Sequence, residues 1–164
     1  AEARRRTFRE ARLERIVRLQ SRALTRVMSL LVDTSVWSLA LRRDGELQTL
    51  EVVALRNALL GTDQVFSTGL VLQELLQGFA GPKARDSIVE RFTALAFVEP
   101  DRQDYIDAAE IRNTCRRHGV QIGTIDALLI QLARRNDLQI LTTDNDFRSA
   151  SLHVEFRLWG PTDG

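Results

Sequence analysis

Four carboxylates stand in stretches of the sequence that otherwise read as buried. Asp33 ends the apolar run "LLVD", and Asp144 follows the run "ILTT". Glu74 interrupts "LVLQELL", and Asp126 interrupts "IGTIDALLI". A buried carboxylate is costly unless it is paired, hydrogen-bonded or bound to a metal ion. Any one of them alone could equally be a helix-terminal charge or a capped core acid, but four together need a counter-charge.

A bound cation is the counter-charge that the sequence favours. The basic residues fall mostly on polar faces, so none of them is an obvious buried partner for the four acids. The histidines His118 and His153 stand alone and Cys115 is the single cysteine, which argues against a zinc cluster and excludes an internal disulfide. Ligands that are all oxygen select Mg²⁺ or Mn²⁺.

The chemistry that such a cluster predicts is metal-assisted hydrolysis of a phosphodiester. One metal ion lowers the pKa of an attacking water, and a second one would steady the leaving oxygen. Metal ions also let an acidic site accept a polyanion, because they reverse the local charge.

The elements that must position these acids alternate between short apolar strands and amphipathic helices. Uninterrupted apolar strands indicate a parallel sheet covered on both faces, so we expect a three-layer α/β/α domain over residues 29–164. Sites in such sheets form beyond the carboxyl ends of the strands, where Asp33 and Asp144 stand. We expect strands at 30–33, 64–68, 97–100, 138–143 and, as an edge strand, 154–159, and helices at 46–61, 69–78, 81–96, 101–119 and 123–136. Residues 144–150 are expected to turn away from the sheet.

Four sequence motifs resemble those of a known nuclease family. "LLVDTSVW", "VLQELLQG", "IGTIDALLIQLA" and "ILTTDNDF" look like the acidic motifs of PIN-domain nucleases, and their order and spacing most resemble the VapC toxins of toxin–antitoxin pairs. The match runs over residues 29–159. It implies a Mg²⁺- or Mn²⁺-dependent endoribonuclease that cleaves a structured RNA such as tRNA or rRNA. It also implies a homodimer that is inhibited by a VapB-like antitoxin.

The resemblance assigns the family's acidic positions to residues of this chain. Asp33 takes the first position, Glu74 the second, Asp126 the third and Asp144 the fourth, although Asp146 in "TDNDF" is an alternative for the last. Asp33 and Asp126 are expected to bind the first metal ion directly. Glu74 is expected to help hold that ion or to orient the water, and Asp144 to complete the shell or recruit a second ion.

Accessory residues are expected around the acids. Ser35 either hydrogen-bonds Asp33 or the scissile phosphate, or is a local turn hydroxyl. Thr124 is a second candidate, with a plain helix N-cap as its alternative. Arg42 and Arg43 are candidates for gripping an RNA phosphate, with solvated surface charge as the alternative.

The charge is unevenly placed along the chain. Residues 1–27 hold nine Arg and three Glu, a net charge of +6, whereas the remaining 14 basic and 19 acidic residues leave −5. We expect residues 1–27 to form a basic amphipathic helix ahead of a nuclease domain that begins at Met28. This extension could be an upstream or fused segment, a helix that packs on the domain or a dimer partner, or an Arg-rich arm that contacts RNA or the acidic cleft.

The compartment and the competing functions follow from the same residues. No apolar run approaches the roughly 20 residues of a membrane span, and the single cysteine suits a reducing cytoplasm. A catalytically inactive PIN-like module that binds RNA or a partner is one alternative function. A metal-dependent phosphatase of the haloacid-dehalogenase type is another, but Ser35 stands where its second aspartate belongs. A receiver domain would need a lysine near the last strand, and Lys83 is not near it.

Overall fold

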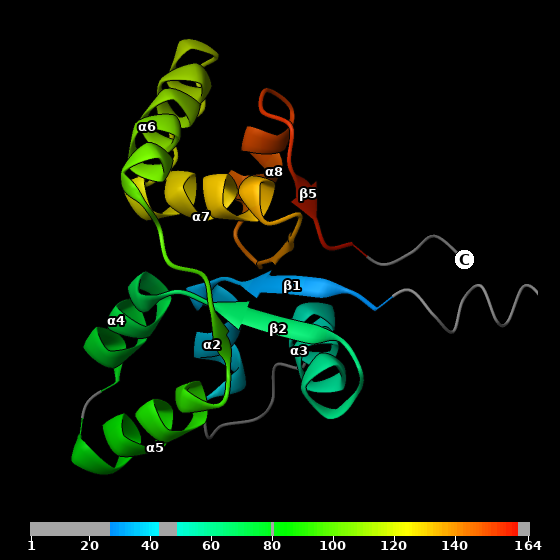
Figure 1. Ribbon diagram of the computed structural model, residues 1–164, viewed down its shortest axis with the longest axis vertical. Coiled ribbons are helices and arrows are strands. Elements are labelled where there is room, and N and C mark those ends of the chain that lie inside the picture. Colours follow the sequence, from blue (N-terminus) through cyan, green and yellow to red (C-terminus); the bar gives the residue numbers. More distant parts are fainter. Residues whose placement is uncertain (1–26, 43–48, 80, 161–164) are drawn as a thin grey trace, which may run out of the picture.

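The computed structural model describes residues 27–42, 49–79 and 81–160. The expected N-terminal amphipathic helix and Arg43 therefore lie outside the described residues. Where the chain is described, it forms a parallel sheet between two layers of helices, as the sequence predicts (Figure 1).

The sheet consists of five strands that all run in the same direction. In spatial order they are β3-β2-β1-β4-β5, with bounds β1 Ser29–Val32, β2 Gln64–Ser67, β3 Ala96–Phe97, β4 Gln139–Leu141 and β5 Arg157–Leu158. The chain fills the sheet from β1 outward to β3 and then returns to place β4 on the other side of β1. The order reverses between β1 and β4, and this is the switch point at which open α/β sheets form their sites.

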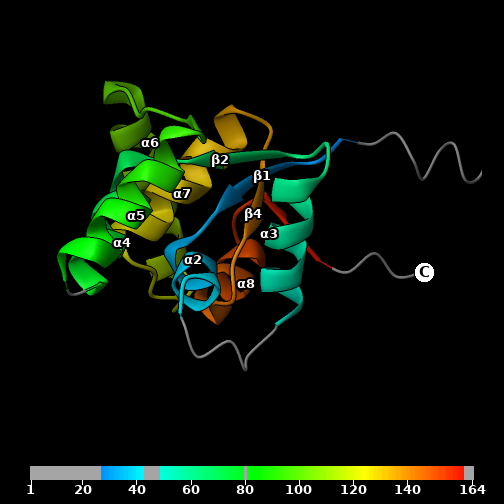
Figure 2. The same cartoon turned by 90° about the horizontal axis from the view of Figure 1, so that it is seen from below.

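The helices divide between the two faces of the sheet. In Figure 1, α2, α3, α4 and α5 lie below β1, and α6, α7 and α8 lie above it. Figure 2 shows the molecule from below, with the first group of helices nearer to the viewer. This division follows from the right-handed crossovers that join parallel strands, because the direction of progress reverses after β3. The bounds are α2 Thr34–Ala40, α3 Leu50–Leu60, α4 Gly69–Gly78, α5 Pro82–Thr93, α6 Arg102–Arg117, α7 Thr124–Arg135 and α8 Asn145–Ser151.

Two helices are absent from the sequence prediction. Residues 34–40 form α2, where we expected no helix. Residues 145–151 form α8, where we expected a turn. Each has seven residues, which is about two turns and too short to show a helical period. Asp33 is the N-cap of α2 and Asp144 is the N-cap of α8, so each strand-end acid also begins a helix.

Several element boundaries differ by a few residues from the prediction. Thr68 is the N-cap of α4. Gly123, and not Thr124, is the N-cap of α7. Strand β3 is only two residues long and starts one residue early, at Ala96. Strand β5 is at the edge of the sheet, as predicted.

The core lies on both faces of the central strands. Leu30, Leu31 and Val32 of β1 are fully buried, and α7 is buried along most of its length. Trp37 of α2 is a core residue that packs on Phe92 of α5 at 4.9 Å between ring centroids. Among the described helices, none combines the length and hydropathy that a membrane span requires.

Candidate active site

Strands β1 and β4 bring the first and last acidic segments together at the switch point. Val32 is in register with Leu141, and Asp33 N donates to Leu141 O over 3.0 Å. Asp33 and Thr142 are therefore neighbours at the carboxyl edge of the sheet, although 109 positions separate them in the sequence.

Asp33 is held by three donors on a single oxygen. Its Oδ2 accepts from Ser35 Oγ at 2.6 Å, Thr142 Oγ1 at 2.9 Å and Ser35 N at 3.3 Å. Ser35 Oγ in turn accepts from Thr143 N at 3.1 Å. The side chain of Asp33 is 6% exposed, so these bonds replace water that burial has removed. Ser35 therefore hydrogen-bonds Asp33, one of the three alternatives given for it from the sequence.

Glu74 reaches the same edge from α4. Its Oε2 accepts from Thr34 Oγ1 at 2.6 Å, a bond that ties α4 to the first residue of α2. Thr34 follows Asp33 directly, so the bond places the Glu74 carboxylate beside the strand end that carries Asp33.

Asp126 lies in the first turn of α7 and folds back on the residue before the helix. Its Oδ2 accepts from Gly123 N at 2.8 Å, the N3-to-N-cap half of a capping box. A Cβ at position 123 would lie 2.7 Å from that oxygen, so any residue larger than glycine would force the carboxylate to shift.

Asp144 completes the group from the start of α8. Its Oδ1 accepts from Asp146 N at 2.9 Å, and its own backbone N donates to Thr142 Oγ1 at 3.0 Å. Thr142 thus connects the positions of Asp33 and Asp144 through one hydroxyl. Asp146 lies in the first turn of α8 and is exposed.

The four acids interact electrostatically through Asp126. Burial raises the pKa of Asp126, and the negative charges of Asp33, Asp144 and Glu74 raise it further, while the bond from Gly123 N lowers it. Asp33, Asp144 and Glu74 thus lie close enough to Asp126 to act on its charge. The structure therefore brings together the four acids that the sequence singled out, and the choice between Asp144 and Asp146 as the last ligand stays a prediction.

Within the described residues, none of these four carboxylates forms an ion pair with a basic side chain. The contrast is Asp104, an acid with 1% exposure on α6, which Arg135 pairs and Gln131 contacts. Asp104 serves the fold and has its cation built in. Of the four site acids only Asp33 is buried, whereas Glu74 and Asp126 are half-buried and Asp144 is exposed, so the expectation of burial holds fully for Asp33 alone.

Each of the four carboxylates has one anchored oxygen and one oxygen with no donor among the described residues. The oxygens without a donor are Asp33 Oδ1, Glu74 Oε1, Asp126 Oδ1 and Asp144 Oδ2. In the described ranges, no three Asp, Glu, His or Cys side chains form a ready-made ligand group. The donor chemistry fits a hard divalent cation, and the side chains would have to rotate toward one another to coordinate it.

The remaining candidates have mixed positions. Thr124 is exposed at the start of α7. The prediction that it is the N-cap is wrong, because Gly123 occupies that position. Arg42 is exposed just beyond α2. The sequence reading missed Thr34, Thr142 and Gly123 as supports of the acids. The signal for Thr34 was its place directly after a strand-end aspartate, and for Gly123 its place three residues before Asp126.

Several solved structures are similar to this fold at low sequence identity. FitAcB from Neisseria gonorrhoeae is 22% identical over 82% of this chain and 99% of the other, with a TM-score of 0.59. VapBC2 from Rickettsia felis, bound to a promoter DNA fragment, is 17% identical over 80% and 98%, with a TM-score of 0.63. VapC20 from Mycobacterium tuberculosis, described as a sarcin–ricin loop cleaving toxin, is 20% identical over 78% and 98%, with a TM-score of 0.59.

These likenesses at low identity establish the fold. No curated protein matches the sequence. The sequence model of the PIN domain matches residues 30–151, a span that begins in β1 and ends with α8 and contains all four acids. The chain therefore belongs to the PIN domain family.

Proposed function

We propose that this protein is a divalent-metal-dependent endoribonuclease and the toxin component of a toxin–antitoxin pair. The observation that carries the proposal is the group of four carboxylates at the switch point, each with one oxygen anchored and one left without a donor. No described basic side chain neutralises them, and oxygen ligands of this kind suit Mg²⁺ or Mn²⁺.

The proposed roles follow from how each acid is held. Asp33 and Asp126 would bind the first metal ion, because hydroxyl and backbone donors fix one oxygen of each. The ion would supply a water of lowered pKa. Glu74, oriented by Thr34, would hold the ion or accept a proton from that water at Oε1, and Asp144 would complete the shell or recruit a second ion. Ser35 and Thr142 are positioning residues.

The partner and the substrate are proposed from the structural neighbours. Several neighbours were solved as VapBC or FitAB complexes, some bound to DNA, which supports a VapB-like antitoxin as the partner of this chain. The description of VapC20 as a sarcin–ricin loop cleaving toxin supports a structured RNA, tRNA or rRNA, as the substrate. We propose that the enzyme acts as a homodimer in the cytoplasm.

The proposal is tested by RNA cleavage with purified protein. Wild-type chain, Asp33→Asn and a matched Asp137→Asn control are incubated with total RNA and Mg²⁺ or Mn²⁺, and cleavage sites are mapped. The control makes the same substitution at a side chain that is 90% exposed. We expect discrete cleavage by the wild type and the control and none by Asp33→Asn. Normal cleavage by Asp33→Asn would refute the assignment, and hydrolysis of p-nitrophenyl phosphate without RNA cleavage would point to a phosphatase.

Metal binding is tested separately from cleavage by thermal melting. An ion present at 100 times its Kd stabilises the folded state by about 2.7 kcal/mol. For a chain of this size, that corresponds to an increase in Tm of roughly 5–11 °C. We expect the increase with Mn²⁺ in the wild type and its loss in Asp126→Asn. An increase in both, or in neither, would contradict the proposed ligand set, and a Mn²⁺ response without RNA cleavage would favour an inactive RNA- or partner-binding module.

A further inference from the structure

A basic cavity lies between the end of α2 and the α4–α5 hairpin. Its volume is about 890 Å³. Among the described residues, three cations and no carboxylate line it, together with an apolar wall that includes the half-buried ring of Phe79. The cations are Arg42, Lys83 and Arg91, and the main apolar residues are Leu41, Phe79 and Ile88.

The described lining of this cavity is cationic, whereas the chain outside residues 1–27 carries a net charge of −5. The three cations also form no ion pair with any residue in the described ranges. Cations that the fold does not use for pairing remain available for an anionic ligand.

Two helices connect the cavity with the acidic group. Helices α2 and α4 lie side by side, with the bond from Thr34 to Glu74 at the acidic end and Leu41 and Phe79 at the cavity end. At 1.5 Å per residue, the cavity lies about 12 Å from Asp33 along α2 and about 8 Å from Glu74 along α4. A nucleic-acid strand spans such a distance with a few nucleotides.

We propose that this cavity is an RNA subsite that binds a nucleotide near the scissile phosphate. The inference rests on the proposed nuclease function and adds the place where the substrate strand is held. The base stacks on Phe79, as bases do on aromatic side chains in single-strand binding sites. Lys83 and Arg91 contact the flanking phosphates and Arg42 guides the strand toward the acids. Cations around an aromatic wall favour RNA over a peptide, because both the charge and the π-face of a nucleotide are matched.

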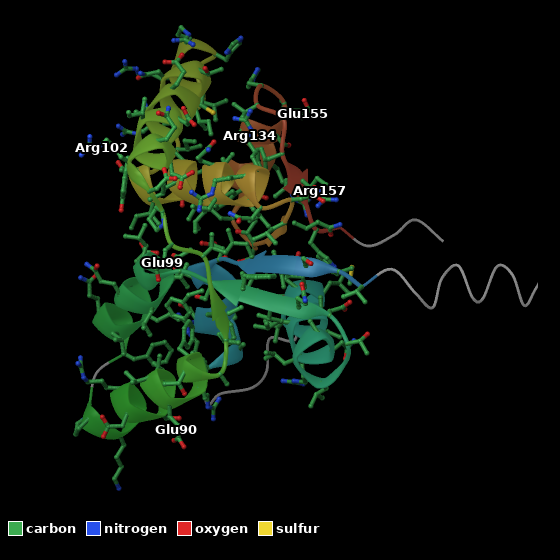
Figure 3. All side chains as sticks on the ribbon, viewed as in Figure 1. Glu90, Glu99, Arg102, Arg134, Glu155 and Arg157 are labelled. Carbon is green, nitrogen blue, oxygen red and sulfur yellow. The ribbon has the colours of Figure 1, made fainter. Side chains whose placement is uncertain are left out.

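The test measures RNA binding by the full chain in EDTA, so that it does not depend on cleavage. A fluorescent single-stranded RNA of about 12 nucleotides, a length within the usual site sizes, is titrated in an anisotropy assay at several salt concentrations. We compare the wild type with Lys83→Gln/Arg91→Gln. The matched control is Arg102→Gln/Arg134→Gln, which removes two exposed cations from the opposite helical layer (Figure 3).

We expect the cavity variant to raise Kd roughly tenfold or more and to lower the salt slope by about 0.7 for each lost phosphate contact. The control should change Kd less than about twofold. Equal effects of the two pairs, or no RNA binding by the wild type, would overturn the subsite. Polyglutamate is titrated in the same way as a probe for an acidic peptide. If the cavity variant lost polyglutamate binding but kept its RNA affinity, the subsite would be overturned in favour of an acidic peptide segment.

The stacking contact has its own readout. RNA carrying 2-aminopurine should show quenched fluorescence on binding to the wild type and to Phe79→Tyr, and unquenched fluorescence with Phe79→Leu at saturating protein. Quenching by Phe79→Leu equal to that of the wild type would contradict the stacking contact. Cleavage by Lys83→Gln/Arg91→Gln with an unchanged KM would overturn the subsite and leave the nuclease intact. Cavity-dependent binding without metal-dependent cleavage would leave the subsite standing and refute the nuclease.

Discussion

Ser35 joins Asp33 to the end of β4, and its replacement by alanine tests how the site is held. Ser35 Oγ donates to Asp33 Oδ2 at 2.6 Å and accepts from Thr143 N at 3.1 Å. A hydrogen bond to a charged group contributes about 1.5–3 kcal/mol. Because Asp33 is only 6% exposed, water replaces the lost donor poorly, although Thr142 still donates to the same oxygen. We therefore expect Ser35→Ala to lower the free energy of unfolding by about 2 kcal/mol.

The assay is thermal melting in EDTA, with Ser38→Ala as the control. The control makes the same change in the same helix at a hydroxyl without a hydrogen bond to any described residue. For a chain of this length, the expected loss in Tm is roughly 4–8 °C for Ser35→Ala. With Asp33 as the proposed metal ligand, RNA cleavage should fall by about 10–100-fold, the usual effect of removing an outer partner of a metal ligand. A Ser35→Ala variant that melts and cleaves like Ser38→Ala would refute the reasoning.

Three other predictions concern the support of the acids and of the fold. Asp126→Asn should raise Tm in EDTA at neutral pH. Burial and like charges raise the pKa of Asp126, so the wild type loses stability as the pH rises from the ordinary pKa of 3.8 through the raised pKa of the folded state. Melting at several pH values checks this, and an equal gain at all pH values would contradict it. Gly123→Ala should lower the free energy of unfolding by about 1 kcal/mol, the usual value of a lost cap. It should also weaken Mn²⁺ binding, because the new Cβ would lie 2.7 Å from Asp126 Oδ2. Calorimetry measures the Mn²⁺ affinity, and an unchanged affinity would show that the carboxylate moves freely. Arg135→Leu leaves Asp104 without its cation and should lower the free energy of unfolding, measured in urea, by about 2–3 kcal/mol. This loss is below the range for fully buried pairs because Arg135 is 34% exposed. A loss below about 1 kcal/mol would show that water or Gln131 replaces the cation.

The layered fold was predictable because each long element has its own hydrophobic period. The strand 64–68 and the helices 69–78 and 101–119 appear within a residue or two of their expected bounds. Helices α2 and α8 were not predictable in this way, because seven residues do not show a period and their first residues follow strand ends. The same two aspartates thus end a strand and cap a helix, and the sequence reading recognised only the first property.

The four candidate acids stand out in the sequence because a carboxylate in an apolar stretch is conspicuous. Their supports were not, because serine and threonine hydroxyls are common at turns and helix starts. Thr142 illustrates the limit: its sequence position does not reveal that it donates to Asp33 and accepts from Asp144 N.

The candidate acids and the kind of ligand that suits them can be inferred from the sequence alone, because residue type and apolar context set the cost of burying a charge. Four acids without an obvious basic partner predict a cation whatever the details of the fold. How those acids are held, and what lies beside them, depends on the folded arrangement of the chain. The hydroxyl of Thr34 reaches Glu74 across 40 positions of the chain, and Arg42 shares a cavity with Lys83 and Arg91. Hydrogen bonds and cavities depend on distances of a few ångströms between segments that the sequence order does not place side by side.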